Sequence, residues 1–159
     1  MAGDPINTAT GNKFQQETDF RSNHWLTFRR FYNSDNGAQY QGAFGNLWRN
    51  SFDRSINIAG IRNANSTAYA TVMRPDGKSE IFSSHALGGW SVQSQGTQDV
   101  LSEPLDANGN VTAEVLFVGA THETETYSPA GQLLSISDQS GQRMTFAYST
   151  ALTRSRTAP

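Results

Sequence analysis

Hydrophobic and polar residues alternate most regularly near the C-terminal end of the chain, between Glu125 and Tyr148. Alternation at period two places one set of side chains on each face of a strand, and the alternating residues here are Leu134, Ile136, Met144, Phe146 and Tyr148. Two segments interrupt this pattern, Ser128–Gly131 and Asp138–Gly141. Each has Gly in fourth position, with Pro second or Asp first, which favours a hairpin turn closed by a glycine bulge. The pattern predicts a β-meander of three strands and two turns.

Shorter alternating stretches precede this meander. A strand is predicted at Lys13–Phe20, and its Phe14, Gln16, Thr18 and Phe20 are expected to share a face. The next strand is predicted at Trp25–Tyr32, where large side chains point to both faces, so we expect both faces to be covered. Further strands are predicted around Phe52–Ile58, Tyr69–Met73, Lys78–Phe82, Val100–Leu101 and Val111–Val118.

Two more turns of the same chemistry are predicted at Arg74–Gly77 and Asp106–Gly109. No window shows an apolar period of 3.6 residues over ten or more positions, so the sequence predicts an all-β antiparallel fold. We expect strands to occupy about half of the chain or more, against the roughly 20–25% that is usual. Residues 1–148 form the predicted β-sheet segment, and residues 149–159 lose the alternation and are interpreted as a frayed or truncated tail.

Several segments resemble the Rhs/YD-repeat family. Residues 3–13 read Gly-Asp-Pro-Ile-Asn-x-x-Thr-Gly-Asn-Lys, and Glu-x-Asp-Phe (17–20) and Leu-x-Phe-x-Arg-x-Tyr-Asn-Ser (26–34) follow; together they resemble the opening of an Rhs shell. The resemblance continues at Gly42–Trp48 and Ser51-Phe52, although Leu47 stands where the family usually has Gly. Tyr-x-x-x-Gly-x-Leu-x-x-Ile-x-Asp-x-x-Gly (127–141), with a second Tyr at 148, resembles one YD repeat in which Ser128 replaces the usual Asp.

This resemblance implies a curled antiparallel sheet of shell type, with a YD-like repeat at about 125–148. It implies a non-enzymatic structural role, because the shells of relatives enclose a C-terminal toxin of interbacterial competition until delivery, often through type VI secretion. The implied partners are further repeats and the enclosed toxin domain of the same parent, and secretion spike proteins. The resemblance also implies synthesis in the bacterial cytoplasm, followed by secretion or surface display as part of a larger effector.

Composition narrows the function classes. The chain of 159 residues is 36% hydrophobic, 11% aromatic and 16% charged, which suits half-wet strands and argues against disorder. The net charge of −2 and the lack of a Lys or Arg run argue against nucleic-acid binding. There is no Cys, which excludes disulfides and thiolate chemistry. No apolar stretch is long enough to span a membrane, and Met1–Ile6 does not have the composition of a signal peptide.

The sequence offers few catalytic or metal-binding motifs. His24, His85 and His122 lie far apart in sequence. In His122–Glu125 the two carboxylates alternate with His122 and Thr124, and we interpret this segment as a polar strand exterior. Asp106–Asn110 departs from the calcium-loop spacing, so we interpret it as a turn. Asn65–Thr67 and Asn110–Thr112 match the glycosylation triplet, and we interpret both as chance matches in a chain that is rich in Asn, Ser and Thr. We expect no catalytic residue, no metal site and no cofactor.

The candidate binding residues are Trp25, Trp48 and Trp90, and the aromatic set also includes Tyr40 and Tyr69. Indole faces stack on sugar rings, and they also fill protein cores. Two function classes therefore stay open. The first is the shell segment, and the second is an independent β-rich surface module that binds carbohydrate or a partner protein.

The last predicted strand, Arg143–Ser149, also predicts an interaction. A piece that ends in this strand leaves one row of backbone N–H and C=O groups without a neighbour, and an open strand is a template for pairing. We therefore expect self-association or strand addition at this edge.

Overall fold

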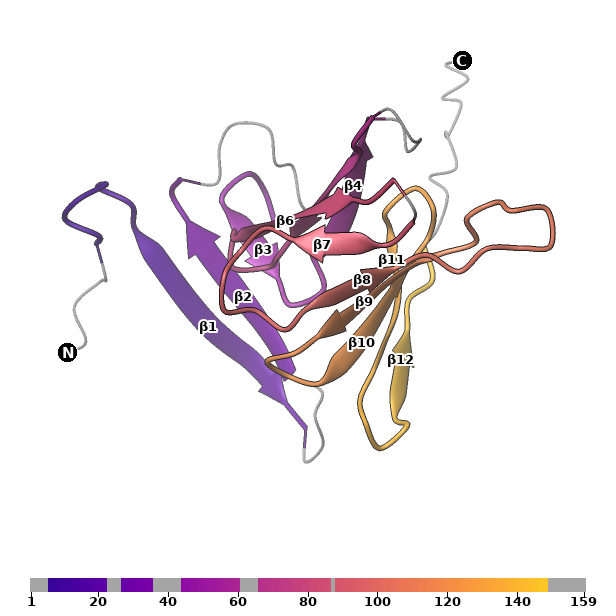
Figure 1. Ribbon diagram of the computed structural model, residues 1–159. Coiled ribbons are helices and arrows are strands. Elements are labelled where there is room, and N and C mark those ends of the chain that lie inside the picture. Colours follow the sequence, from indigo (N-terminus) through magenta and orange to yellow (C-terminus); the bar gives the residue numbers. More distant parts are fainter. Residues whose placement is uncertain (1–5, 23–26, 36–43, 61–65, 87, 149–159) are drawn as a thin grey trace, which may run out of the picture.

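The computed structural model describes residues 6–22, 27–35, 44–60, 66–86 and 88–148. Within these ranges the chain has no helix, and strands account for 52% of the structure. The predicted all-β fold is therefore confirmed. The strands form three antiparallel sheets, none of which closes into a barrel (Figure 1).

Each sheet is a meander of strands that are consecutive in sequence. Sheet 1 contains β1 (Phe14–Arg21), β2 (Thr27–Asn33) and β3 (Trp48–Asn50). Sheet 2 contains β4 (Ser55–Ala59), β5 (Tyr69–Met73), β6 (Ser79–Ser84) and β7 (Trp90–Val92). Sheet 3 contains β8 (Val100–Ser102), β9 (Glu114–Val118), β10 (Glu123–Tyr127), β11 (Leu133–Ser137) and β12 (Arg143–Thr145). No described helix is long and apolar enough to cross a membrane.

The four predicted turns are confirmed. In each of them the amide of the fourth residue donates a hydrogen bond to the carbonyl of the first, as Gly131 does to Ser128 at 2.8 Å and Gly141 to Asp138 at 3.3 Å. Their glycines all have positive φ: Gly77 (88°), Gly109 (83°), Gly131 (81°) and Gly141 (85°). Only glycine adopts this conformation without steric cost, so glycine closes each turn. The register between β10 and β11 shifts after Thr126, as a bulge requires.

The structure corrects the predicted face of β1. Gln16 lies opposite Phe31 and Thr18 opposite Arg29, but the register shifts between Thr18 and Phe20. Phe20 therefore lies opposite Phe28 and joins the other face, where it is 53% exposed. An irregularity of one residue reverses the alternation because the side-chain period of a strand is two.

The prediction that both faces of β2 are covered is only partly confirmed. Six of its seven residues are half-buried and only Phe31 is buried. Figure 1 shows the reason, since β1 and β2 project from the side of the body that sheets 2 and 3 form. Trp25, the start of the predicted strand, lies outside the described residues.

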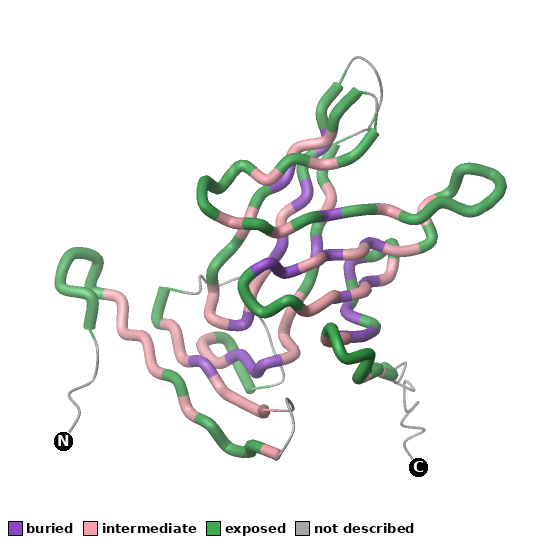
Figure 2. The backbone as a smooth tube through the Cα atoms, turned by 60° about the horizontal axis from the view of Figure 1, so that its bottom comes forward, coloured by how far each residue is buried: buried purple, intermediate pink, exposed green. Residues whose placement is uncertain are grey.

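Sheets 2 and 3 share one hydrophobic core. Its buried members are Ile56, Ala70, Val72, Phe82, Leu101, Leu116, Val118, Tyr127, Leu133 and Ile136. In Figure 2 the buried positions concentrate in the centre of the body, whereas the hairpin ends are exposed. The bridge between Ser55 and Gln132 also joins the start of β4 to the turn between β10 and β11.

A chain of aromatic rings attaches sheet 1 to this body. Phe28 of β2 lies 6.2 Å from Phe44 and 6.0 Å from Phe52 between ring centroids, and Phe52 lies 5.1 Å from Phe146. Such tilted and edge-on contacts add to the free energy of apolar burial. The contact between Phe52 and Phe146 therefore joins the segment after β3 to the segment after β12.

The last strand is shorter than predicted. β12 ends at Thr145 instead of Ser149, because only three of its residues pair with β11. Phe146 still donates its amide to the carbonyl of Leu134 at 2.9 Å, and the hydroxyl of Tyr148 donates to the carbonyl of Leu133 at 2.7 Å. Residues 149–159, the predicted tail, lie outside the described part of the chain.

Candidate functional site

A buried carboxylate lies between sheets 2 and 3. Alternation along β10 sends Glu123, Glu125 and Tyr127 to one face and Thr124 and Thr126 to the other. Glu125 and Tyr127 are both 0% exposed. The interpretation of this segment as a polar exterior is thus wrong, because the face that carries the carboxylates points inward.

Two arginines and a tyrosine hold Glu125. Nη1 of Arg74 donates to Oε2 at 2.8 Å, Nη1 of Arg54 donates to Oε1, and the hydroxyl of Tyr127 donates to Oε2. Arg54 also lies 3.6 Å from Oε2 of Glu123, and its Nε donates to the carbonyl of Ser51 at 2.9 Å. A fully buried carboxylate requires such partners, because taking an ion out of water costs several kcal/mol.

The pKa directions follow from this geometry. Burial alone would raise the pKa of Glu125, but the attraction of Arg54 and Arg74 outweighs it and the pKa is lowered. Burial and the neighbouring Glu125 charge raise the pKa of Tyr127. Burial alone would lower the pKa of the Arg74 guanidinium, but the attraction of Glu125 outweighs burial and the pKa is raised. Glu125 is therefore ionised at neutral pH with both oxygens occupied, which suits a structural ion pair better than proton transfer.

Two carboxyl groups, those of Glu80 and Asp99, form a further pair in the body. Burial, followed by a hydrogen bond with Asp99, raises the pKa of Glu80 on β6 to about 7. Asp99 precedes β8, and its Oδ1 accepts the amide of Gly119 at 2.8 Å. Two carboxyl groups in contact resist a second negative charge, so Glu80 keeps its proton at a higher pH than a free glutamate does.

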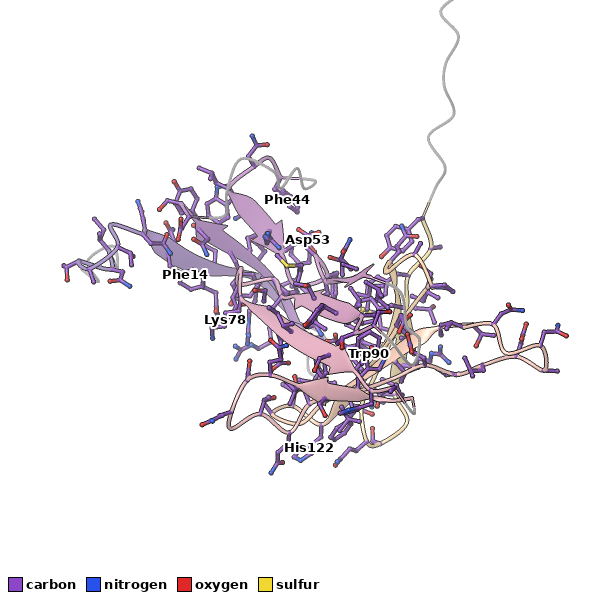
Figure 3. All side chains as sticks on the ribbon, turned by 45° about the horizontal axis from the view of Figure 1, so that its top comes forward. Phe14, Phe44, Asp53, Lys78, Trp90 and His122 are labelled. Atoms are coloured by element: carbon purple, nitrogen blue, oxygen red, sulfur yellow. The ribbon has the colours of Figure 1, made fainter. Side chains whose placement is uncertain are left out.

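Three hollows border the Glu125 cluster, which consists of Glu125, Tyr127, Arg54 and Arg74, at its arginines. A groove of about 770 Å³ separates sheet 1 from the turns of the body, and Figure 3 labels Phe14 and Lys78, which both line it. A smaller cavity of about 240 Å³ adjoins it and shares Arg29, Phe31 and Arg54 with it. A cleft of about 750 Å³ runs beside β4 and is lined by residues such as Ile56, Leu133 and Tyr148. Arg54 lines all three hollows.

Of the candidate tryptophans, the structure describes Trp48 and Trp90, and it places them in different sheets. Trp25 and Tyr40 lie outside the described residues. Trp48 belongs to β3 of sheet 1, whereas Trp90 belongs to β7 of sheet 2 and packs against the core (Figure 3). Tyr69 is 47% exposed on β5.

Trp48 instead has neighbours that the sequence analysis did not single out. Its ring lies edge-on to that of Tyr32, with centroids 5.4 Å apart, and Cζ of Arg30 lies 5.2 Å from its centroid. Arg30 in turn pairs with Glu17 and Asp19, each at 2.7 Å. Strand pairing places Tyr32 opposite Trp48, so these groups gather on one face of sheet 1.

The remaining candidates are dispersed. Nε2 of His85 contacts Oγ of Ser91 at 2.6 Å, and the ring of His122 lies 6.2 Å from that of Phe117. His24 and Asn65 lie outside the described residues. In the described part of the chain, no three metal-binding side chains gather in one place.

The segment from Asp106 to Asn110 forms the turn that the sequence predicts. The carboxylate of Asp106 accepts hydrogen bonds from the amides of Asn108 and Asn110, both at 2.8 Å. These bonds and the one from the Asn110 side chain, which is the largest cause, lower the pKa of Asp106. The carboxylate thus caps its own turn.

Residues 3–82 match the family model DUF6531, described as a domain of unknown function, and the match covers about half of the chain. The chain belongs to the DUF6531 family. No curated protein and no solved structure matches it.

The DUF6531 match ends at residue 82, inside β6 and therefore inside sheet 2. Arg54 and Arg74 lie within the matched segment, whereas Glu125 and Tyr127 lie beyond it. The buried ion pair thus joins the DUF6531 segment to sheet 3.

The Glu125 cluster is the site that sequence reasoning missed. A partial signal exists, since Glu-Thr-Glu-Thr-Tyr (123–127) alternates strictly and Arg74 opens a predicted turn. The alternation separates two faces but does not indicate which one is buried. That depends on what packs against β10.

Proposed function

We propose that this chain is a non-enzymatic structural segment of an Rhs/YD-type shell that encloses a C-terminal toxin. Sheet 3 is the observation that carries the proposal. Its five strands form a meander in sequence order, and the repeat-like stretch coincides with β10, β11 and β12. A repeat of this kind extends a wall by adding one strand after another.

The edge of sheet 3 supports continuation. β12 pairs with β11 on one side, and no other described strand pairs with it. Because Phe146 directs its amide toward β11, alternation directs the amide of Thr145 outward. An outward row of backbone groups is what a following repeat needs for pairing.

In this proposal the partners are further repeats and a toxin domain of the same parent, with secretion spike proteins at delivery. The parent is made in the bacterial cytoplasm and is then secreted or displayed as a larger effector. The buried ion pair and the shared core supply rigidity, which suits a container wall.

The coding region around this chain tests the proposal. We expect it to encode additional Tyr- and Gly-containing repeats and a distinct C-terminal domain, and we expect electron microscopy of that longer product to show a hollow β-walled particle. A flanking sequence without repeats, or a product without a cavity, would overturn the proposal.

The grouping of Trp48 with Tyr32 and Arg30 favours a second candidate, a surface module that binds carbohydrate. Aromatic rings such as those of Trp48 and Tyr32 stack on sugar rings, and a charged planar side chain such as Arg30 hydrogen-bonds to sugar hydroxyls. Titration with maltohexaose and chitohexaose tests it by tryptophan fluorescence. This candidate predicts a spectral change that Trp48→Phe abolishes and Trp90→Phe retains, and it fails if neither sugar changes the emission of the parent.

A further inference from the structure

Arg29 on β2 is half-buried, and none of the described residues supplies a counter-charge for it. Its Nε is covered and has no hydrogen-bond partner, and the described residues provide no ion pair for its guanidinium. Other arginines differ, since Arg30 pairs with Glu17 and Asp19, and Arg54 and Arg74 share Glu125. Withdrawing a guanidinium from water without a partner is unfavourable, so Arg29 carries unused binding capacity.

Arg29 lines both the groove of about 770 Å³ and the adjoining cavity of about 240 Å³. The same wall of the groove carries Phe14 and Phe31, whose rings lie 6.4 Å apart. The opposite wall carries the turn from Arg74 to Lys78. The site therefore places a free guanidinium beside apolar rings.

The charges that line the groove and cavity are unbalanced. Arg29, Arg54, Arg74 and Lys78 supply positive charge, while Asp76 and Glu123 supply negative charge. Lys78 contacts Asp76 at 3.4 Å, with its side chain 83% exposed, and Arg54 and Arg74 are committed to Glu125. Arg29 is the cation left over, and its planar fork fits a carboxylate in bidentate geometry.

We propose that this groove binds an acidic segment of a partner protein, in which a carboxylate pairs with Arg29 and apolar side chains cover Phe14 and Phe31. Charge complementarity calls for the acidic group, and the phenylalanine rings favour a peptide over a small inorganic anion. This inference is independent of the shell proposal.

Binding of a labelled peptide tests the inference on the full chain. The probe is an eight-residue peptide in which glutamate and leucine alternate, and its binding is measured by fluorescence anisotropy. The control peptide carries glutamine in place of glutamate. We expect saturable binding of the acidic peptide only, and we expect no competition by inorganic phosphate at equal concentration. Absence of binding, equal binding of both peptides or displacement by phosphate would each overturn the proposal.

Two substitutions of the same chemistry localise the binding. Arg29→Gln is expected to weaken binding about tenfold or more, because a buried charge pair is lost. Arg21→Gln is the matched control, since Arg21 is exposed at the end of β1 and does not line the groove, and it is expected to leave affinity within about twofold. Equal losses in the two variants would overturn the assignment to Arg29.

Stability supplies a readout that a purely structural role would not give. Arg29→Met keeps much of the side-chain volume and removes the unpaired charge, so we expect it to raise the urea midpoint of unfolding while binding is lost. A lowered midpoint would mean that Arg29 is paired within the chain, and it would overturn the proposal.

Discussion

Glu125 receives hydrogen bonds from three residues that lie in different parts of the chain. Its replacement by Gln keeps the shape but leaves Arg54 and Arg74 without their counter-charge. We expect Glu125→Gln to lower the free energy of unfolding by about 3–5 kcal/mol, as breaking a buried pair does. Urea unfolding measures this. Glu123→Gln is the matched control, because Glu123 is 3.6 Å from Arg54 and 21% exposed, and its effect should be much smaller.

The same variant tests the lowered pKa of Glu125. A carboxylate whose pKa is lower in the folded state stabilises the fold above its unfolded pKa of about 4.3, and this contribution disappears as pH falls through the folded pKa. The difference in unfolding free energy between parent and Glu125→Gln should therefore shrink below about pH 4. A difference that is constant from pH 3 to pH 7 would contradict the ionised pair.

Glu80 predicts the opposite dependence on pH. Its pKa is raised to about 7, so the folded state keeps a proton that the unfolded state releases near pH 4.3, and stability falls as pH rises between these values. Glu80→Gln imitates the protonated form beside Asp99. We expect a higher melting temperature than the parent at pH 8 and little difference at pH 5. An equal gain at both pH values would contradict the raised pKa of Glu80.

At the scale of the elements, two turns of the same chemistry differ in their surroundings. Gly131 and Gly141 have similar φ, but a Cβ at Gly131 would lie 1.7 Å from the carbonyl oxygen of Ile56, whereas no atom of the described residues lies within 4 Å at Gly141. Gly141→Ala should destabilise the chain by about 1–2 kcal/mol, the cost of a left-handed conformation. Gly131→Ala should be worse, because β4 must move. Thermal melts compare the pair, and equal effects would contradict the contact with β4.

The free edge of β12 remains a predicted interaction surface. We expect the molar mass, measured by light scattering after size exclusion, to rise with protein concentration. Thr145→Pro should reduce this association, because it removes an outward amide without removing a hydrogen bond to β11. A monomer at every concentration would contradict this use of the edge.

At the scale of the whole molecule, the DUF6531 segment does not contain its own core. Ile56, Val72 and Phe82 lie within residues 3–82, but they pack in one cluster with Leu116 and Leu133 of sheet 3. We therefore expect residues 1–82 alone to unfold without a cooperative transition. Residues 1–148 should melt like the full chain, and circular dichroism measures both. A sharp melt of residues 1–82 would contradict the shared core.

Local signals explain why much of the fold could be predicted. Strand alternation and Gly-ended turns act within a few residues, so the positions of β5, β6, β10 and β11 and four turns were accessible from the sequence.

Other features depended on contacts between distant parts of the chain. The sequence alone determined that Glu123, Glu125 and Tyr127 share a face, because a strand alternates wherever it lies. Only the tertiary structure decided that this face is buried, that Arg54 and Arg74 meet Glu125, and that Trp48 lies beside Tyr32. These outcomes depend on which strands pair and which sheet packs on which, and such non-local energies are not encoded in any short stretch of residues.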